Sequence, residues 1–365
     1  MAKIQEREIK VRLQDLDIED FTNDIVRPKK VSSQKLTQWA WEEGFISSKR
    51  AFGDDGERQT ITPIFKCGDL LTFVATKDFN EKHLYDARFC NWRFCPMCAW
   101  RLALKRVFVL KIVMAKLSKE KYRFLFVTLT APNVLAEELS VEITRYNQGF
   151  QRLIQRKKYK NFIVGGVRKL EVTHNEKANT YHPHLHILLC VKADYFKRVN
   201  QKNPKTGEKE NFYPNMIMID EWREDWQRAM RNELAEQIDV KAISNNPKKL
   251  AKSIVELSKY TVKDSEMTES KEVFSAMYKG LKGKRLFSPF GNMKKLFSEF
   301  KKDPQSFSEY FEMREPKDWY WKIIEAWQND RKDYDETWEE LTDEEITAAN
   351  KRYVGFLTEG LDTEE

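Results

Sequence analysis

The stretch that decides the fold is Tyr-His-Pro-His-Leu-His-Ile-Leu-Leu-Cys, residues 181–190, which holds three of the chain's five histidines. In a β-strand, alternate residues point to the same face. His182, His184 and His186 would therefore line one face, while the leucine and isoleucine between and after them point to the other. One imidazole on such a strand is typical of a satisfied core histidine. Three in register instead indicate a shared ligand such as a metal ion.

The segments around this strand follow a regular order. β-Branched and aromatic runs predict strands at residues 123–130, 168–173 and 238–244, and apolar residues at helical spacing predict helices at 140–157 and 220–237. Gly165 and Gly166 are expected to break the chain before the second strand. The order β-α-β-β-α-β is that of the split βαβ, or ferredoxin-like, arrangement. We therefore expect an α+β fold whose antiparallel sheet has the histidine strand near its centre and both helices on the face away from the histidines.

The flanking regions carry weaker patterns. Residues 1–33 have the composition of a flexible or loosely docked arm. Helices are expected at 34–46, 103–118 and 248–262, with a polar insertion at 197–215 and a helical, Trp-rich and then acidic part after residue 300. These patterns predict four regions: an N-terminal arm and helix (1–61), a cysteine-rich module with its linking helix (62–118), the sheet domain (119–265) and a helical C-terminal region with an acidic tail (266–365).

Charge is unevenly placed along the 365 residues. The formal net charge is +7, but the last 35 residues hold four Lys or Arg against twelve Asp or Glu, so the remaining 330 carry +15. Such a basic body favours a nucleic-acid partner over a membrane, although ordinary surface lysines give the same total. No apolar run approaches the roughly 20 residues of a membrane span, and no signal-peptide pattern opens the chain. We expect a cytoplasmic protein.

Four of the five cysteines, Cys67, Cys90, Cys95 and Cys98, fall within 32 residues. An odd total in a cytoplasmic chain argues against a disulfide framework. The Cys-Pro-Met-Cys turn is a thiolate knuckle, and two further cysteines complete the ligands of a structural Zn²⁺ site. The alternative is that Cys67 is a core thiol and the other three are incidental. Basic residues around the knuckle are candidate DNA contacts: Arg93, Arg101 and Lys105.

A third ligand for the histidines is expected on the neighbouring strand. Glu171 lies between Leu170 and Val172, where a carboxylate is costly unless it is paired or binds metal. The alternative is a salt bridge to a nearby Lys or Arg. Two imidazoles and one carboxylate leave positions open on the ion, which favours a catalytic site, and mixed N/O ligation favours Mn²⁺ over Mg²⁺. His182 is either a fourth ligand or a substrate contact.

A candidate nucleophile follows the last predicted strand. Glu256 and Tyr260 are four residues apart and would share one helix face, with Lys263 one turn further on. By itself such a pair is typical of a helix surface. Beside a metal site, however, a tyrosine hydroxyl could attack a phosphodiester. Lys263 would then help to hold the phosphate or the metal-bound water.

Taken together, these motifs resemble the replication initiators of small rolling-circle plasmids of Gram-positive bacteria. These belong to the superfamily of histidine-hydrophobic-histidine (HUH) endonucleases. The resemblance covers roughly residues 62–295. It rests on five segments: Phe126–Thr130, Tyr181–Ile187, Glu256–Lys263, the cysteine segment Arg93–Arg101, and the later stretch formed by Gly283–Leu286 with Phe290–Gly291.

The resemblance implies an activity. Such initiators nick one strand at the plasmid's double-strand origin, join a tyrosine to the 5′ phosphate and leave a 3′ hydroxyl that primes synthesis. It would make Tyr260 the nucleophile and Glu256 the group that activates water for the terminating cleavage. The partners implied are origin DNA, with a single-stranded nick region, and a host helicase and DNA polymerase. Two alternatives stay open: a conjugative relaxase or HUH transposase, and a zinc-dependent DNA-binding regulator without catalysis.

Overall fold

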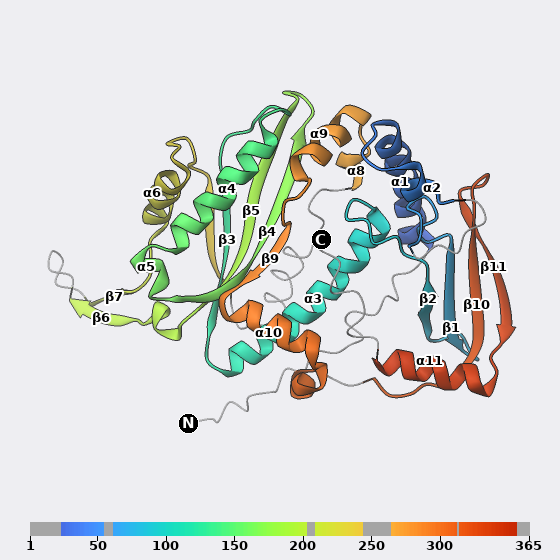
Figure 1. The fold of residues 1–365 in the computed structure, drawn as a ribbon. Helices are drawn as coiled ribbons and strands as arrows, with labels where there is room; N and C mark the ends of the chain where they lie inside the picture. Colours follow the sequence, from blue (N-terminus) through green and yellow to red (C-terminus); the bar gives the residue numbers. More distant parts are fainter. Residues whose placement is uncertain (1–22, 55–60, 203–208, 244–263, 312–313, 356–365) are drawn as a thin grey trace. The chain divides into compact units, whose positions relative to one another are not determined.

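The computed structural model describes residues 23–54, 61–202, 209–243, 264–311 and 314–355. These residues fall into two compact units, which are described separately. Unit 1 comprises the described residues within 1–112, 258–278 and 300–365, and unit 2 those within 113–257 and 279–299. Both contain antiparallel sheets and helices (Figure 1), which confirms the predicted α+β class. Within the described ranges, no helix is long and apolar enough to cross a membrane.

The sheet of unit 2 has five strands in the order β8-β3-β5-β4-β9, all paired antiparallel. The strands are β3 (Arg123–Thr130), β4 (Ile163–Asn175), β5 (Thr180–Val191), β8 (Ile238–Ile243) and β9 (Phe287–Phe290). Among the four strands predicted from the sequence, the first and third, β3 and β5, are the inner ones. The histidine strand is therefore central, as expected.

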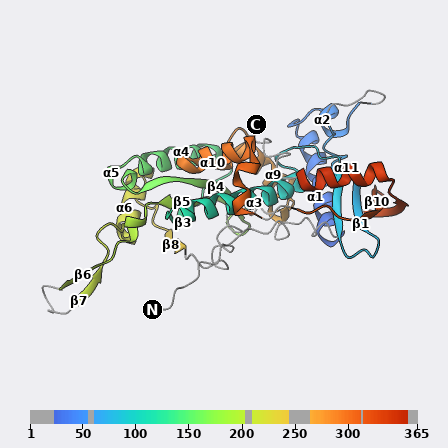
Figure 2. The same cartoon turned by 90° about the horizontal axis from the view of Figure 1, so that it is seen from below.

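Two amphipathic helices complete the predicted order. In α4 (Leu139–Ile154) the buried residues recur at helical spacing, and they include Ile143, Tyr146 and Phe150. In α6 (Ile219–Met230), Trp222 and Trp226 are buried, and the Trp226 indole donates a hydrogen bond of 2.7 Å to the Thr130 carbonyl. Figure 2 shows α4 running alongside β4 and β5. The helix predicted to reach residue 237 ends at Met230, because Arg231 adopts a left-handed backbone conformation.

The expectation that Gly165 and Gly166 break the chain is wrong, since both lie inside β4. Their lack of a side chain serves close packing instead. A Cβ on Gly166 would lie 2.4 Å from the Leu188 carbonyl oxygen and 2.7 Å from the Phe290 ring. The close approach admits β9 as a fifth strand, and β9 comes from the later stretch, after the predicted end of the sheet domain.

Unit 1 contains a second antiparallel sheet, of order β11-β10-β1-β2. Its strands are β1 (Leu70–Thr76), β2 (Lys82–Ala87), β10 (Trp319–Gln328) and β11 (Asp333–Glu340), and α11 (Asp343–Gly355) follows them. The part after residue 300, which the sequence predicts to be helical, therefore contains two strands as well as helix. Burial along the second half of β10 alternates residue by residue, with Ile323, Glu325 and Trp327 buried, which is the period of a strand.

The predicted N-terminal arm is also partly helical. Helix α1 spans Asn23–Glu42 with Pro28 inside it, whereas the sequence predicted a helix only from residue 34. A buried lysine anchors the first half of this helix. Lys30 is fully buried and donates hydrogen bonds to the carbonyls of Phe65 and Cys67, at 2.7 and 2.9 Å, and pairs with Asp69. These bonds hold the arm against the cysteine-rich segment.

The remaining elements range from α3, a helix of 24 residues, to helices and strands of four residues. They are α2 (Ser48–Phe52), α3 (Pro96–Lys119), α5 (Lys157–Lys160), η3 (Ala193–Phe196), β6 (Val199–Lys202), β7 (Lys209–Phe212), α8 (Asp264–Met267), α9 (Lys271–Leu281), α10 (Gly291–Lys302) and η4 (Pro304–Tyr310). The polar insertion contributes the separate β6–β7 hairpin.

Replacing Gly166 by alanine should destabilise unit 2. The added methyl group would press on the Leu188 carbonyl and the Phe290 ring, and overpacking of this kind costs about 2 kcal/mol. Urea unfolding measures the loss. Gly283→Ala is the control, because a Cβ there meets nothing within 4 Å and only its positive φ of 72° is unfavourable. A Gly166→Ala cost no larger than that of Gly283→Ala would contradict the packing argument.

Unit 1 should lose stability in mild acid through His83. Its ring packs edge-on against Tyr353, and burial, with the charges of Arg314 and Arg352, lowers the pKa of His83 to about 3. The unfolded chain, with a pKa near 6.5, then binds more protons between these pH values, so stability falls as pH falls. The loss from pH 7 to pH 5 is about 2 kcal/mol. His83→Gln should flatten this slope in denaturant unfolding at the two pH values; an unchanged slope would exclude His83 as its source.

Candidate functional site

The centre of the unit 2 sheet carries a polar face. In the strand register, His186 lies between Thr128 of β3 and Lys169 of β4. His184 lies in the next row, directly opposite Glu171. Because residues paired across antiparallel strands point to the same face, these side chains share one surface of the sheet. The leucine and isoleucine of β5 that point to the other face are buried.

Glu171, His184 and His186 form a compact group. The His184 Nε2 atom is 3.8 Å from Glu171 Oε1, and the His186 Nε2 atom is 3.4 Å from Glu171 Oε2. One ligand atom from each residue lies within 4.8 Å of the others, so the group could hold a metal ion. The predicted set of two imidazoles and one carboxylate is thus brought together. His182 stands outside this group, although its ring centroid is 5.4 Å from that of His184.

The rings of the two histidines are oriented by polar neighbours. Burial lowers the pKa of His184 to about 4, so its imidazole is neutral at pH 7. His184 Nδ1 is 3.3 Å from the His182 carbonyl, which can only accept a hydrogen bond, so the proton is on Nδ1 and Nε2 keeps its lone pair. The Nδ1 atom of His186 is 3.2 Å from the Thr128 hydroxyl. Neutral imidazoles with an oriented free nitrogen are the form that binds metal.

Glu171 is charged although it is largely buried. Burial alone would raise the pKa of Glu171, but the hydrogen bond from His186 and the charge of Lys169 outweigh it and hold this pKa at about 2. The Lys169 ammonium lies 3.0 Å from Glu171 Oε2. The alternative of a salt bridge to a neighbouring lysine is therefore also present in the structure, beside the metal-ligand geometry.

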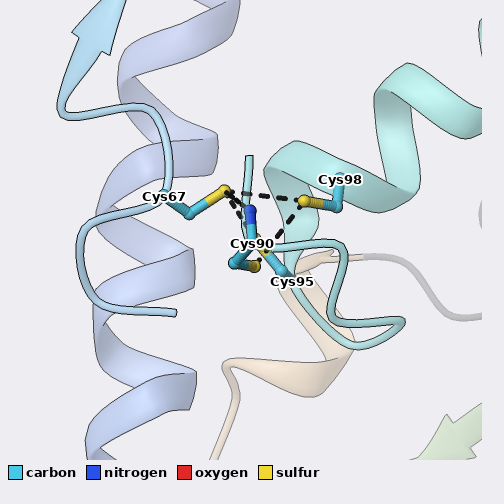
Figure 3. Close-up of side chains that lie close together, drawn as sticks. All are labelled: Cys67, Cys90, Cys95 and Cys98. Carbon is cyan, nitrogen blue, oxygen red and sulfur yellow. Dashed lines mark hydrogen bonds between the residues drawn. The ribbon is translucent and has the colours of Figure 1, made fainter. Parts of the chain in front are cut away.

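The four predicted cysteines form a second group, in unit 1 (Figure 3). The Sγ atom of Cys98 is 3.5 Å from that of Cys67 and 3.6 Å from that of Cys90, and Cys95 Sγ is 3.6 Å from Cys67 Sγ. Burial raises the pKa of the Cys67 and Cys90 thiols well above the usual range. Cys67 belongs to the group, so the alternative of an incidental core thiol does not fit the geometry.

The chain around the cysteines is arranged to support thiolates. Backbone N–H groups point at sulfur: that of Asn91 lies 3.2 Å from Cys98 Sγ, and that of Cys90 lies 3.4 Å from Cys67 Sγ. The Ser33 hydroxyl is 3.1 Å from Cys95 Sγ. Helix α3 begins at Pro96, directly after Cys95, so the knuckle is fixed at a helix start. These polar contacts stabilise negative charge on sulfur.

The predicted DNA contacts differ in exposure. Arg93 is half-buried, and its guanidinium lies 5.4 Å from the Phe94 ring. The guanidinium of Arg101 stacks over Phe89 at 4.4 Å. Lys105 is only 8% exposed, so the prediction that it contacts DNA disagrees with its burial. The predicted catalytic residues Glu256, Tyr260 and Lys263 lie outside the described residues.

Two polar members of the sheet face were missed by sequence reasoning, Lys169 and Thr128. The signal was available, because Lys169 is two residues before Glu171 and so shares its face in a strand. Thr128 lies inside the β-branched and aromatic segment that predicts a strand at 123–130, and only the β3–β5 register places it beside His186. Ser33 was missed because its helix was not predicted.

Comparison with known proteins agrees with the motifs. A family described as replication protein matches residues 81–335. The chain is 35% identical over 255 residues to a protein named "Protein rep" from Streptococcus pneumoniae serotype 2, covering 69% of this chain and 74% of that relative. It is 39% identical over 212 residues to a Staphylococcus aureus "Protein rep", covering 58% of this chain and 85% of the relative.

A third relative matches more of the chain. A "Protein rep" from Lactiplantibacillus plantarum is 32% identical over 296 residues, covering 78% of this chain and 85% of the relative. No solved structure matches the chain significantly. The matched span contains the histidine group and three of the four cysteines. On this basis the chain belongs to the family of replication proteins, as its motifs indicated.

Proposed function

We propose that the protein initiates rolling-circle replication of a plasmid by nicking one strand at the double-strand origin. The observation that carries this proposal is the Glu171–His184–His186 group at the centre of the sheet, in a chain of the replication protein family. A buried, charged carboxylate beside two imidazoles suits phosphodiester chemistry. The β8-β3-β5-β4 strand order supports an HUH endonuclease fold.

The metal ion that suits this group is Mn²⁺ or Mg²⁺, and mixed nitrogen and oxygen ligation favours Mn²⁺. Glu171, His184 and His186 would hold it, with His182 as a further ligand or a substrate contact. When bound, the ion supplies Lewis-acid polarisation of the scissile phosphate. The protein orients this site through Thr128 and the His182 carbonyl, which fix the two imidazole rings.

The covalent step is assigned to Tyr260 on the strength of the resemblance. Its hydroxyl oxygen attacks phosphorus and loses its proton, the bond to the 3′ oxygen breaks, and that oxygen leaves as a 3′ hydroxyl primer. The 5′ phosphate stays on the tyrosine. Glu256 then activates water for the second cleavage that ends the round, and Lys263 holds the phosphate.

We infer that the cysteine group holds a structural Zn²⁺. A tetrahedral site with Zn–S bonds of about 2.3 Å has sulfur–sulfur edges of about 3.8 Å. The distances of 3.5 and 3.6 Å are close to this and far from a disulfide bond of about 2.05 Å. Four sulfur ligands leave no open position, so this metal would be structural.

The wider picture follows from the same assignment. Origin DNA is the proposed partner, contacted in part by Arg93 and Arg101, with a host helicase and polymerase acting after the nick in the cytoplasm. The predicted boundaries at residues 61, 118 and 265 stay proposals. A relaxase or transposase is less favoured, because the cysteine segment and Glu256 fit the initiators. A regulator without catalysis would need neither Tyr260 nor the histidine face.

Tyr260→Phe should abolish nicking while leaving DNA binding intact. Wild-type protein, Mn²⁺ and a supercoiled plasmid of its host would give a nicked product on a denaturing gel and an oligonucleotide on the Tyr260 peptide by mass spectrometry. Tyr213→Phe, at an exposed tyrosine of unit 2, is the matched control and should nick normally. Glu256→Ala should keep the first nick and impair termination. Specific binding without any wild-type nick would instead favour the regulator.

Removing one ligand of the histidine group should weaken Mn²⁺ binding about a hundredfold or more. Calorimetric titration of His184→Ala and Glu171→Gln measures this loss. His174→Ala is the matched control, since His174 lies on the same sheet but hydrogen bonds to Asn179 at 3.0 Å, outside the group. Equal Mn²⁺ affinity in His184→Ala and His174→Ala would remove the metal assignment.

The purified chain should contain zinc, and Cys67→Ser should lose it. Without the ion, the four sulfur groups lose their shared partner, and we expect the melting temperature to fall by about 10 °C. Elemental analysis and thermal unfolding measure both effects. Cys190→Ser removes a buried thiol of unit 2 and should retain the zinc. Equal zinc content in the wild type, Cys67→Ser and Cys190→Ser would contradict the proposed zinc site.

A further inference from the structure

Lys169 occupies an unusual place in the histidine group. It is paired directly with His186 in the β4–β5 register, on the face that also carries Glu171. Its side chain is 3% exposed and that of Glu171 is 10% exposed. The Lys169 ammonium is 3.0 Å from Glu171 Oε2, and His186 Nε2 is 3.4 Å from the same oxygen. One carboxylate oxygen thus faces both a lysine and a proposed metal ligand.

This arrangement conflicts with a bound metal ion. An ion bound to Glu171 Oε2 at about 2.1 Å would lie at most about 5 Å from the ammonium, because Lys169 Nζ is 3.0 Å from the same oxygen. A divalent cation and an ammonium repel each other at that distance, and in a largely buried site solvent screens the repulsion weakly. The Lys169–Glu171 pair therefore opposes metal binding unless the ammonium moves to another anion.

The proposed substrate supplies that anion, and this inference rests on the proposed function. A phosphodiester positioned for attack lies beside the metal ion, within reach of a flexible four-carbon side chain. We propose that Lys169 is a phosphate-binding residue of this site: it pairs with Glu171 while metal is absent and turns to a DNA phosphate when metal is bound. Metal and DNA then bind cooperatively. Glu171 forms a salt bridge with Lys169 in the metal-free protein and is a metal ligand in the complex with metal and DNA.

The test measures the affinity of the full chain for Mn²⁺. The electron paramagnetic resonance signal of free Mn²⁺ reports how much of the ion is bound. It is measured with and without a single-stranded oligonucleotide of about ten thymidines. Lys169→Gln keeps a hydrogen-bond donor but removes the charge. Without oligonucleotide, we expect it to bind Mn²⁺ about tenfold more tightly than wild type. The oligonucleotide should raise the Mn²⁺ affinity of the wild type more than that of the variant. Lys169→Arg should behave as wild type.

The matched control is Lys241→Gln. Lys241 pairs with Asp239 at the same spacing, on strand β8 at the edge of the sheet, and the pair is exposed. Its loss should leave Mn²⁺ affinity unchanged. Equal or weaker Mn²⁺ binding by folded Lys169→Gln would overturn the proposal. Should that variant unfold, the wild type decides: no gain of Mn²⁺ affinity with oligonucleotide overturns it as well.

Failure of the proposed function gives a different result. If His184→Ala binds Mn²⁺ as tightly as the wild type, the proposed metal site is wrong, and the proposal for Lys169 is refuted as well. If His184→Ala abolishes binding while Lys169→Gln changes neither affinity nor coupling, only the role of Lys169 is refuted. Thermal unfolding of each variant separates these outcomes from loss of structure.

Discussion

The register between β4 and β5 is the constraint on which the rest of unit 2 depends. It places Glu171 opposite His184 and Lys169 opposite His186. A slip of β4 by one residue would turn Lys169 and Glu171 to the opposite face, away from the histidines of β5. The register is itself held by close packing, because the β4 backbone at Gly166 leaves no room for a side chain next to Leu188 and Phe290. A packing contact near the start of β4 thereby supports the position of the polar side chains at its middle.

The sequence predicted the sheet well because its signals are local. The alternation of histidines in β5 and the helical spacing of Tyr146 and Phe150 in α4 are visible in any short window. The cysteine group was predictable for the same reason, since the spacing of thiolate ligands is a short-range pattern. Glu171 was found because a carboxylate between two apolar residues violates the burial rule of a strand.

What could not be predicted depends on contacts between distant segments. In the sequence, Lys30 has the features of an ordinary surface lysine. In the folded chain, its ammonium group contacts Phe65, Cys67 and Asp69. The Trp-rich segment of β10 is predicted to be helical from its sequence, but in the fold it pairs with β1 as a strand. Gly165 and Gly166 look like a break in the chain because the strand that needs their bare backbone, β9, is more than a hundred residues away along the sequence. Each error concerns a partner that lies outside any local window.

The fifth strand has a topological consequence for the segment that carries Tyr260. The chain leaves the sheet at the end of β8, on one edge, and returns as β9, on the opposite edge. The segment between them is therefore tethered at both ends to the same scaffold. A DNA end joined to Tyr260, the proposed nucleophile, would therefore be attached to a segment whose two flanking strands, β8 and β9, pair with β3 and β4 of one sheet.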